Sequence, residues 1–176
     1  TPLYSSAASD VYKRQVWSAA RHLTDDLTAH RLGNMLLAAG LVAMLYLLIA
    51  ESFGWRAGLM AAGLLFSFPR FFFHAHLASL DVPAAVMTFA VIFVFWKTKD
   101  RPGAGGAIGL GVVWGLAVAT KINAVFVMPA LLLWVLIFQR QKDLLLRLMV
   151  ASLTAFAVFV LSWPWLFPDL VGRLWE

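Results

Sequence analysis

The sequence predicts an all-α fold, a polytopic bundle of about six transmembrane helices. The chain of 176 residues is 62% hydrophobic and only 13% charged, and its mean hydropathy is +0.82. A soluble domain carries about 25% charged residues. Long apolar runs are separated by short segments that contain charges, glycine and proline. Because a run of about 20 apolar residues crosses the hydrocarbon core, these observations predict an integral membrane protein.

Three apolar segments in the first half of the chain have the length and flanks of membrane-spanning helices. The run from Leu32 to Phe53 is long enough to cross about 30 Å of hydrocarbon at about 1.5 Å per residue. The run from Trp55 to Phe68 is slightly short, which helix tilt or local thinning of the bilayer accommodates. The run from Val82 to Trp96 has Pro83 in its first turn and ends at an interfacial tryptophan.

The second half of the chain predicts three more helices. The apolar stretch that begins at Gly103 is too long for one span, and a lysine at the bilayer centre is costly. We therefore expect a helical hairpin with Lys121 and Asn123 at its tip. A last span, from Leu144 to Leu161, precedes an aromatic and proline-rich segment. Small residues allow close helix packing, and we expect it at Gly105, Gly106, Gly109, Gly111 and Gly115.

Residues 1–15 differ from the rest of the chain. They are polar and without hydrophobic periodicity, and we expect a non-native or disordered leader outside the fold. Residues 16–176 then belong to one polytopic membrane domain. Because the chain begins without methionine and stops without a closing feature, we expect an internal fragment of a longer protein.

The distribution of positive charge predicts the orientation in the membrane. Alternate connections form two sets, and the set with more basic residues in short loops is expected to be cytoplasmic. The other set then lies on the outer, periplasmic side. Since the basic residues are spread among loops and form no stripe, the net charge of +5 does not indicate nucleic-acid binding. The first set contains Arg56, Lys97, Lys99, Arg101, Arg140, Lys142 and Arg147, and the second contains Arg31, Arg70, Lys121 and Arg173.

Polar groups that favour a functional site gather in the outer connection at residues 69–83. This short segment contains Arg70, His74, His76 and Asp81 between two apolar stretches. Ionisable groups near lipid are costly unless they pair, bind a ligand or line a water-filled cavity, so they indicate a site. The alternative is an interfacial loop whose polar groups face water.

The residue types on the outer side are those that bind a lipid-linked phosphate. Arg31, Arg70 and Lys121 supply the cations that hold phosphate, and His74 is a further hydrogen-bond donor to phosphate. Asp81 is the candidate catalytic carboxylate, which could accept a proton from an attacking hydroxyl, orient a cation or hold a metal. Transfer of a sugar from such a carrier needs a carboxylate base and cations that stabilise the departing phosphate. No cofactor is required.

A divalent metal is an alternative that the sequence leaves open. The chain has no cysteine, so any metal needs histidine and carboxylate ligands. His74 and His76 are weak candidates, because residues two apart share a face only in an extended segment.

Several motifs resemble one family when they are taken in order. They are Arg31-Leu32 before an apolar helix, the turn at residues 53–58, the segment SFPRFFFHAHLASLDVPAA and the hairpin tip GLAVATKINA. From about His22 to the C-terminus the chain resembles bacterial membrane glycosyltransferases of the GT-C fold, which are related to dolichyl-phosphate-mannose protein mannosyltransferases and lipid A aminoarabinose transferases.

The resemblance implies an inverting transferase that uses a polyprenyl-phosphate sugar donor at the outer membrane surface. The acceptor is a protein, lipid or glycan. Arg31 matches the arginine that opens the helix after the first outer loop, Asp81 the acidic residue of a later outer loop, and Lys121 the lysine of a GLAxxTK-like segment. The family's principal catalytic acid lies in the first outer loop, most of which this chain lacks. Asp25 and Asp26 are not assigned that role, and we expect the fragment alone to be inactive.

Two other classes of protein compete with this interpretation. A transporter or flippase-like bundle predicts that Lys121 is buried at mid-membrane, in a discontinuous helix. A structural membrane subunit predicts that the outer charges scatter without converging. The transferase predicts that Lys121 lies at the outer surface beside Arg70 and Asp81.

Overall fold

The computed structural model describes residues 26–77, 79–100, 103–139 and 141–163. In these ranges the chain forms helices and no strand, which confirms the all-α prediction. The expected leader, residues 1–15, and the segment 164–176 with Arg173 lie outside the described residues. The helices are α2 (Asp26–Phe53), α3 (Trp55–Ser67), α4 (Pro69–Ala75), α5 (Asp81–Thr98), α6 (Ala104–Thr120), the 3-10 helix η1 (Ile122–Phe126), α7 (Val127–Trp134), the π-helical turn η2 (Val135–Gln139) and α8 (Lys142–Ser162).

Four helical segments are long and apolar enough to cross a membrane: α2 from Arg31, α5, the continuous stretch Ile122–Gln139, and α8. The pair α3 and α4 makes a fifth candidate, bent by 71°. The sixth expected span, α6, is an apolar helix of 17 residues. That is about 25 Å of helix, the lower limit for a span. The prediction of about six spans is therefore confirmed for four, or for five if the bent pair is one span.

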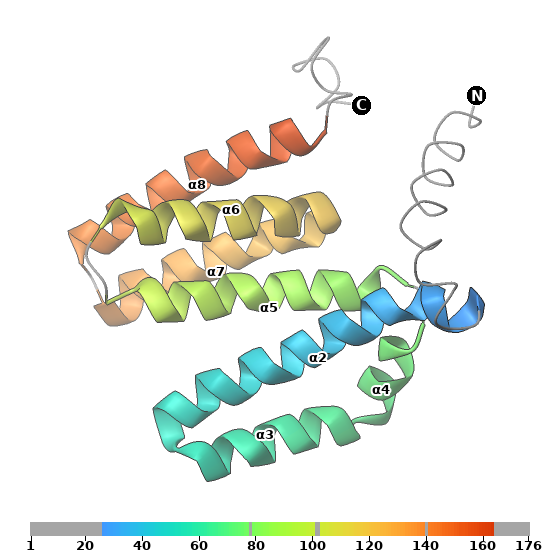
Figure 1. Cartoon of the computed structure of the whole chain (residues 1–176). Helices are drawn as coiled ribbons and strands as arrows, with labels where there is room; N and C mark the ends of the chain where they lie inside the picture. The colour runs from blue at the N-terminus through green and yellow to red at the C-terminus, as the bar shows by residue number, and fades with distance from the viewer. Residues whose placement is uncertain (1–25, 78, 101–102, 140, 164–176) are drawn as a thin grey trace, which may run out of the picture.

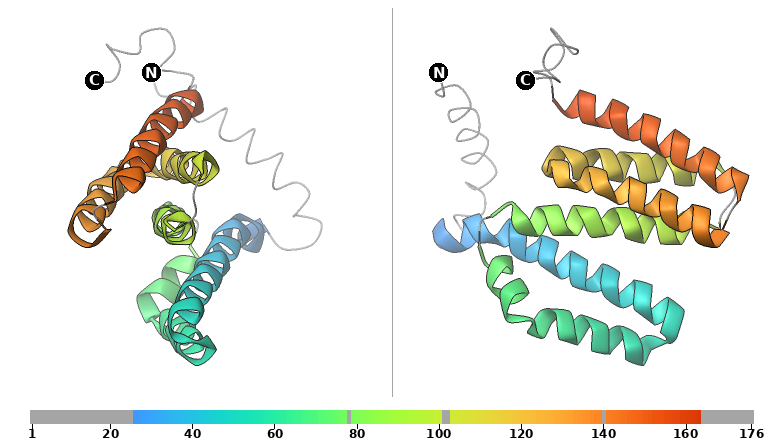
Figure 2. Two further views of the ribbon diagram at one scale, coloured as in Figure 1. Left: turned by 90° about the vertical axis from the view of Figure 1, so that its left-hand side faces the viewer. Right: turned by 180° about the vertical axis from the view of Figure 1, so that it is seen from behind.

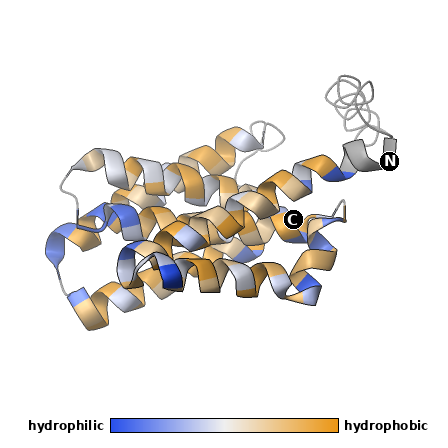
Figure 3. Cartoon of the chain, turned by 60° about the horizontal axis from the view of Figure 1, so that its bottom comes forward, coloured by the Kyte–Doolittle hydropathy of each residue, from blue (hydrophilic) through white to orange (hydrophobic). Residues whose placement is uncertain are grey.

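The long helices lie roughly parallel or antiparallel to one another, and their connections meet at two ends of the bundle, whereas the short α4 turns away from α3 by 71° (Figures 1 and 2). The hairpin of α2 and α3 lies at one edge, α8 lies at the other, and α5 is between them. The α5 helix packs on α2 on one side and on α6 on the other. Hydrophilic residues gather mostly toward the helix ends (Figure 3). The residues that were expected on one side of the membrane therefore lie on helices whose ends meet at the same end of the bundle.

The contact between α6 and α8 is the most extensive in the bundle. A Cβ atom on Gly111 would lie 2.5 Å from the carbonyl oxygen of Ala151, and one on Gly115 would lie 2.7 Å from that of Ala155. Gly106 lies close to Thr98 of α5 in the same way, with a distance of 3.0 Å to its Cβ. Gly105 and Gly109 have open space around them. The prediction of close packing is therefore confirmed at Gly106, Gly111 and Gly115, and it is wrong at Gly105 and Gly109.

A second cluster of buried residues joins α2, α4 and α5 next to the connection between α4 and α5. Ala38 and Leu41 of α2 pack against Ala75, Val82 and Val86. This cluster fixes α4 and the start of α5 against one face of α2.

The aromatic run at residues 71–73 is helical, where the sequence suggested an irregular connection. Phe68 is extended, with φ −72° and ψ 112°, as expected for a residue before proline. Pro69 then starts α4 at N1, the helical position where its fixed φ and missing N–H cost least.

Candidate functional site

Two connections at one end of the bundle, from α3 to α5 and from α6 to η1, bring four of the predicted residues together. Arg70 and His74 lie on α4, and Asp81 is the first residue of α5. Lys121 lies between α6 and η1, at the tip of the predicted hairpin.

Asp81 is the centre of this group. Its Oδ1 accepts a hydrogen bond from Lys121 Nζ at 3.1 Å, and its Oδ2 lies 3.9 Å from His74 Nδ1. The side chains of Asp81 and Lys121 are 57% and 45% exposed, so both are open to a ligand. The distance to His74 is within the range of an ion pair but too long for a hydrogen bond. The imidazole Nδ1 is itself buried, and none of the described residues forms a hydrogen bond with it.

Lys121 is placed by the way in which α6 ends. Its backbone is extended, with φ −154° and ψ 124°, and this stops the α-helix. The Lys121 carbonyl accepts a hydrogen bond from the Ala124 N–H at 3.0 Å, which starts η1. The indole Nε1 of Trp114 donates to the Ala124 carbonyl at 2.9 Å and ties the tip back to α6. The predicted hairpin tip is confirmed, and it ends level with the start of α5 (Figure 1).

Two adjoining hollows meet at the Asp81–Lys121 pair. The first, of about 350 Å³, contains the ionisable side chains of Arg70, His74 and Asp81 beside aromatic residues. The second, of about 370 Å³, extends along α5 from Lys121 and is mostly apolar. Both include Ala85. The first is lined by Phe68, Arg70, Phe71, His74, Asp81, Val82 and Ala85, and the second by Ala84, Ala85, Thr88, Phe89, Ile92, Lys121, Asn123 and Ala124.

A comparison with protein-family models identifies the chain. Residues 18–167 match the family described as dolichyl-phosphate-mannose-protein mannosyltransferase. The chain belongs to this family. It is a membrane glycosyltransferase of the mannosyltransferase type, as the resemblance implied. Neither the curated proteins nor the solved structures contain a significant match to the chain.

In this mannosyltransferase-family chain, Arg31 lies on α2 and not on the segments that carry the Asp81–Lys121 pair. It is half-buried in α2 and does not line the hollow that contains Arg70, His74 and Asp81. It precedes Asn34 by three residues, and residues at this spacing share a helix face. Because Asn34 contacts the connection between α4 and α5, Arg31 lies on the α2 face that is turned toward this connection.

His74 and His76 do not converge on one point. His76 Nδ1 lies 2.7 Å from the carbonyl oxygen of Phe72, and the rings of Phe72 and His76 lie 4.5 Å apart between centres, with their planes tilted by 46°. His76 lines a different hollow, formed with α2 and α3 residues such as Met35 and Phe66. The extended segment that a two-histidine metal site required is not formed, because residues 69–75 are helical. Within the described residues, no group of three or more His, Asp or Glu side chains could hold a metal ion.

The sequence reasoning missed Asn34. Its amide nitrogen donates to the carbonyl oxygens of Leu77 and Ser79, the latter at 2.8 Å. The available signal was a polar side chain in an apolar run, three residues after Arg31. The hydroxyl oxygen of Ser79 is itself buried and has no hydrogen-bond partner within the described residues.

Proposed function

We propose that this chain transfers a sugar from a polyprenyl-phosphate-linked donor to a protein, lipid or glycan acceptor at the periplasmic face of the bacterial inner membrane. The observation that carries the proposal is the Lys121–Asp81 pair at 3.1 Å, beside a hollow lined by Arg70 and His74. Three cationic or hydrogen-bonding groups thus surround one carboxylate at the end of an apolar bundle. That arrangement has the charge to hold a phosphate at a membrane surface.

The donor phosphate is held by groups of different geometry. Arg70 offers a planar fork of N–H donors, Lys121 a point charge and His74 an imidazole nitrogen that has no partner within the described residues. Arg31 is the fourth predicted donor, and it would have to reach the phosphate from α2.

The apolar hollow along α5 suits the lipid part of the same molecule. Ala85, Thr88 and Ile92 follow one another at helical spacing along its wall. From Asp81 to Ile92 the helix rises about 16 Å at about 1.5 Å per residue. A molecule with an anionic head and an apolar chain would therefore meet the cations first and the apolar wall below them.

The reaction replaces one C–O bond by another. The acceptor's oxygen forms a bond to the anomeric carbon of the sugar, and the bond from that carbon to the phosphate oxygen breaks. The electron pair leaves with the polyprenyl phosphate, whose growing negative charge Arg70 and Lys121 stabilise. The acceptor's proton passes to a carboxylate base. Asp81 is the carboxylate in this hollow, and it also orients Lys121 and His74.

The depth of Lys121 favours the transferase over the transporter. The transporter alternative requires this lysine at mid-span, whereas Lys121 lies between the end of α6 and the start of the candidate span Ile122–Gln139. The convergence of Arg70, His74, Asp81 and Lys121 also argues against a purely structural subunit. At the opposite end of the bundle lie Lys97, Lys99 and Arg147, and this charge distribution supports the periplasmic orientation of the site.

Binding of polyprenyl phosphate to the chain in lipid nanodiscs tests the proposal. Binding is the readout because the resemblance places the principal catalytic acid in an earlier loop. We expect saturable binding that Arg70→Ala and Lys121→Ala each weaken by about tenfold or more, since hydrogen bonds to charged groups contribute about 1.5–3 kcal/mol.

Arg56→Ala is the matched control. Arg56 and Arg70 are both exposed, each is the second residue of its helix, and each change removes one positive charge. We expect Arg56→Ala to bind as the unmodified chain does, and polyprenol without phosphate not to compete. Equal weakening by both arginine changes, or no saturable binding, would reject the phosphate site.

A further inference from the structure

We infer that Asn34 is a positioning residue, which holds the connection between α4 and α5 so that Asp81 and His74 face the donor phosphate. The inference rests on the proposed function for its purpose, but its geometric part is tested separately. Asn34 is half-buried on α2 and is not part of the ionisable group itself.

Both N–H donors that a carboxamide nitrogen carries have an acceptor here. The Asn34 amide donates to the carbonyl oxygen of Leu77 and to that of Ser79, at 2.8 Å. These bonds span 43 and 45 residues of sequence, so they fix the connection to a distant helix.

Asn34 continues the buried stripe of α2 to its polar end. Ala38 and Leu41 follow it at spacings of four and three residues, and both pack in the cluster with Ala75 and Val82. Apolar packing thus fixes α4 and α5 from Ala75 and Val82 inward. Asn34 fixes the backbone between these two residues.

Backbone hydrogen bonds hold this connection at its two margins. The Leu77 N–H donates to the His74 carbonyl at 3.1 Å, and the Ala84 N–H donates to the Leu80 carbonyl at 3.0 Å. Between these margins, the carbonyls of Leu77 and Ser79 point to the α2 amide. The connection therefore takes its position from a side chain of another helix.

The position of Ser79 determines that of Asp81, which follows it by two residues. The bond from Asp81 to Lys121 measures 3.1 Å, close to the outer end of the usual range for hydrogen bonds. A shift of about 1 Å at the start of α5 would break it, and misplacements of that size have large effects on catalysis.

The connection can be probed by thiol labelling, because the chain contains no cysteine. Ser79→Cys replaces a buried hydroxyl that has no hydrogen-bond partner, so the change removes no hydrogen bond. In the chain reconstituted in nanodiscs, we expect slow reaction of this thiol with a water-soluble maleimide. Adding Asn34→Ala or Asn34→Asp should accelerate labelling by about tenfold or more, the factor that two lost hydrogen bonds imply.

Two controls separate positioning from general destabilisation. Thr98→Cys reports on the far end of α5, and its labelling rate should not change with Asn34→Ala. Ser52→Ala removes a hydroxyl whose hydrogen bond, at 3.0 Å, stays within α2, and it should leave Ser79→Cys shielded. In the same variants without cysteine, Asn34→Ala and Asn34→Asp should also weaken polyprenyl phosphate binding, and Ser52→Ala should not.

The outcomes are distinct. If Asn34→Ala leaves the Ser79→Cys labelling rate unchanged, or accelerates labelling at both cysteine positions equally, the positioning role is rejected. Local acceleration without weaker phosphate binding rejects the link to the donor. If the unmodified chain does not bind polyprenyl phosphate, the proposed function fails, whereas the labelling result still decides whether Asn34 holds the connection.

Discussion

Within the described residues, two lysine–carboxylate ion pairs connect α5 to other elements, one at each end of the bundle. At the start of α5, Asp81 pairs with Lys121, and near its end Lys97 pairs with Glu51 of α2. The two carboxylates are similarly exposed, at 57% and 53%. As contacts between exposed charges the pairs are equivalent, and each contributes about 0–1 kcal/mol to stability.

The surroundings of the two pairs differ. Lys97 lies 5.5 Å from the centre of the Phe93 ring, and the neighbouring Lys99 lies 4.8 Å from that of Trp96 and pairs with Asp100. Both lysines thus interact with carboxylates and aromatic rings at their own end of the bundle. The Asp81–Lys121 pair instead adjoins two hollows and an imidazole nitrogen that has no hydrogen-bond partner. An ion pair alone therefore does not indicate a site, whereas surplus donors beside a hollow do.

The largest expected difference between the two ends of the bundle is the effect on sugar transfer of replacing each carboxylate by its neutral amide. We expect Asp81→Asn to reduce sugar transfer by about 100-fold or more, because general base catalysis contributes about 10²–10⁴-fold. Glu51→Gln should change transfer by no more than about threefold, the effect of an exposed ion pair. The measurement is transfer from a polyprenyl-phosphate sugar by the full-length gene product in membrane vesicles.

Membrane insertion is the control for both variants. Each should accumulate in the membrane fraction as the unmodified protein does, because neither removes buried apolar surface. If Asp81→Asn keeps more than about a third of the transfer rate, no catalytic role remains for this carboxylate.

A shift of α6 should affect the ion pair at one end of the bundle and not the pair at the other. Gly115→Ala places a Cβ atom 2.7 Å from the Ala155 carbonyl oxygen and pushes α6 away from α8. Overpacking of this kind costs about 1–3 kcal/mol. Lys121 at the end of α6 would shift, whereas the Glu51–Lys97 pair joins α2 and α5 and would not. We therefore expect a lower unfolding free energy, measured by chemical denaturation in detergent, together with weaker polyprenyl phosphate binding.

Gly109→Ala makes the same chemical change on the same helix in open space. Alanine favours helix formation over glycine by about 0.8–1.0 kcal/mol, so this variant should be as stable as the unmodified chain or more so. If the two variants were destabilised equally, the close approach of α6 to α8 would not be the reason why Gly115→Ala lowers stability.

Much of this architecture follows from the order of apolar runs. Alternating spans place every second connection at the same end, which is why Arg70, Asp81 and Lys121 could be assigned to one side before the structure was known. The hairpin tip at Lys121 also followed from the cost of a charge at mid-membrane. The catalytic and phosphate-binding roles of these residues stay predictions, since the geometry brings the side chains together without testing what they bind.

The errors arise where local sequence gives no signal of tertiary packing. The run Phe71–Phe73 suits an interfacial connection as well as a helix, and only the packing of Ala75 on α2 favours the helix that separates His74 from His76. Gly105 and Gly109 share the pattern of Gly111 and Gly115 but face away from α8. The link from Asn34 to Ser79 spans 45 residues and depends on how α2 and α5 meet.

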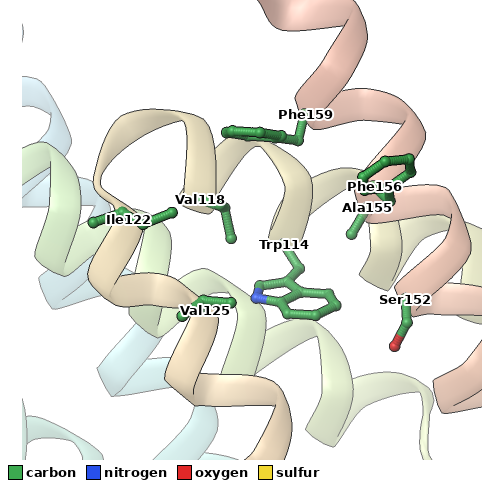
Figure 4. Close-up of a pocket in the computed structure, with 8 residues that line it drawn as sticks. All are labelled: Trp114, Val118, Ile122, Val125, Ser152, Ala155, Phe156 and Phe159. Atoms are coloured by element: carbon green, nitrogen blue, oxygen red, sulfur yellow. The ribbon is translucent and has the colours of Figure 1, made fainter. Parts of the chain in front are cut away.

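The smallest expected effect concerns the indole that ties the hairpin tip to α6. Trp114 lies among the apolar side chains of a hollow of about 360 Å³, between η1 and α8 (Figure 4). Trp114→Phe keeps an aromatic ring there but removes the N–H that donates to Ala124 at 2.9 Å. One neutral hydrogen bond contributes about 1 kcal/mol, so polyprenyl phosphate binding in nanodiscs should weaken by about two- to fivefold as Lys121 loses its fixed position.

Trp96→Phe provides the corresponding change at the other end of the bundle. Trp96 contacts Trp134 at 5.9 Å between ring centres and Lys99 at 4.8 Å, and neither partner belongs to the candidate site. It should therefore leave phosphate binding unchanged even if it lowers stability. Equal weakening by the two tryptophan variants would show that binding follows the stability of the whole bundle, and the distinction between its ends would then rest on Asp81 and Arg70 alone.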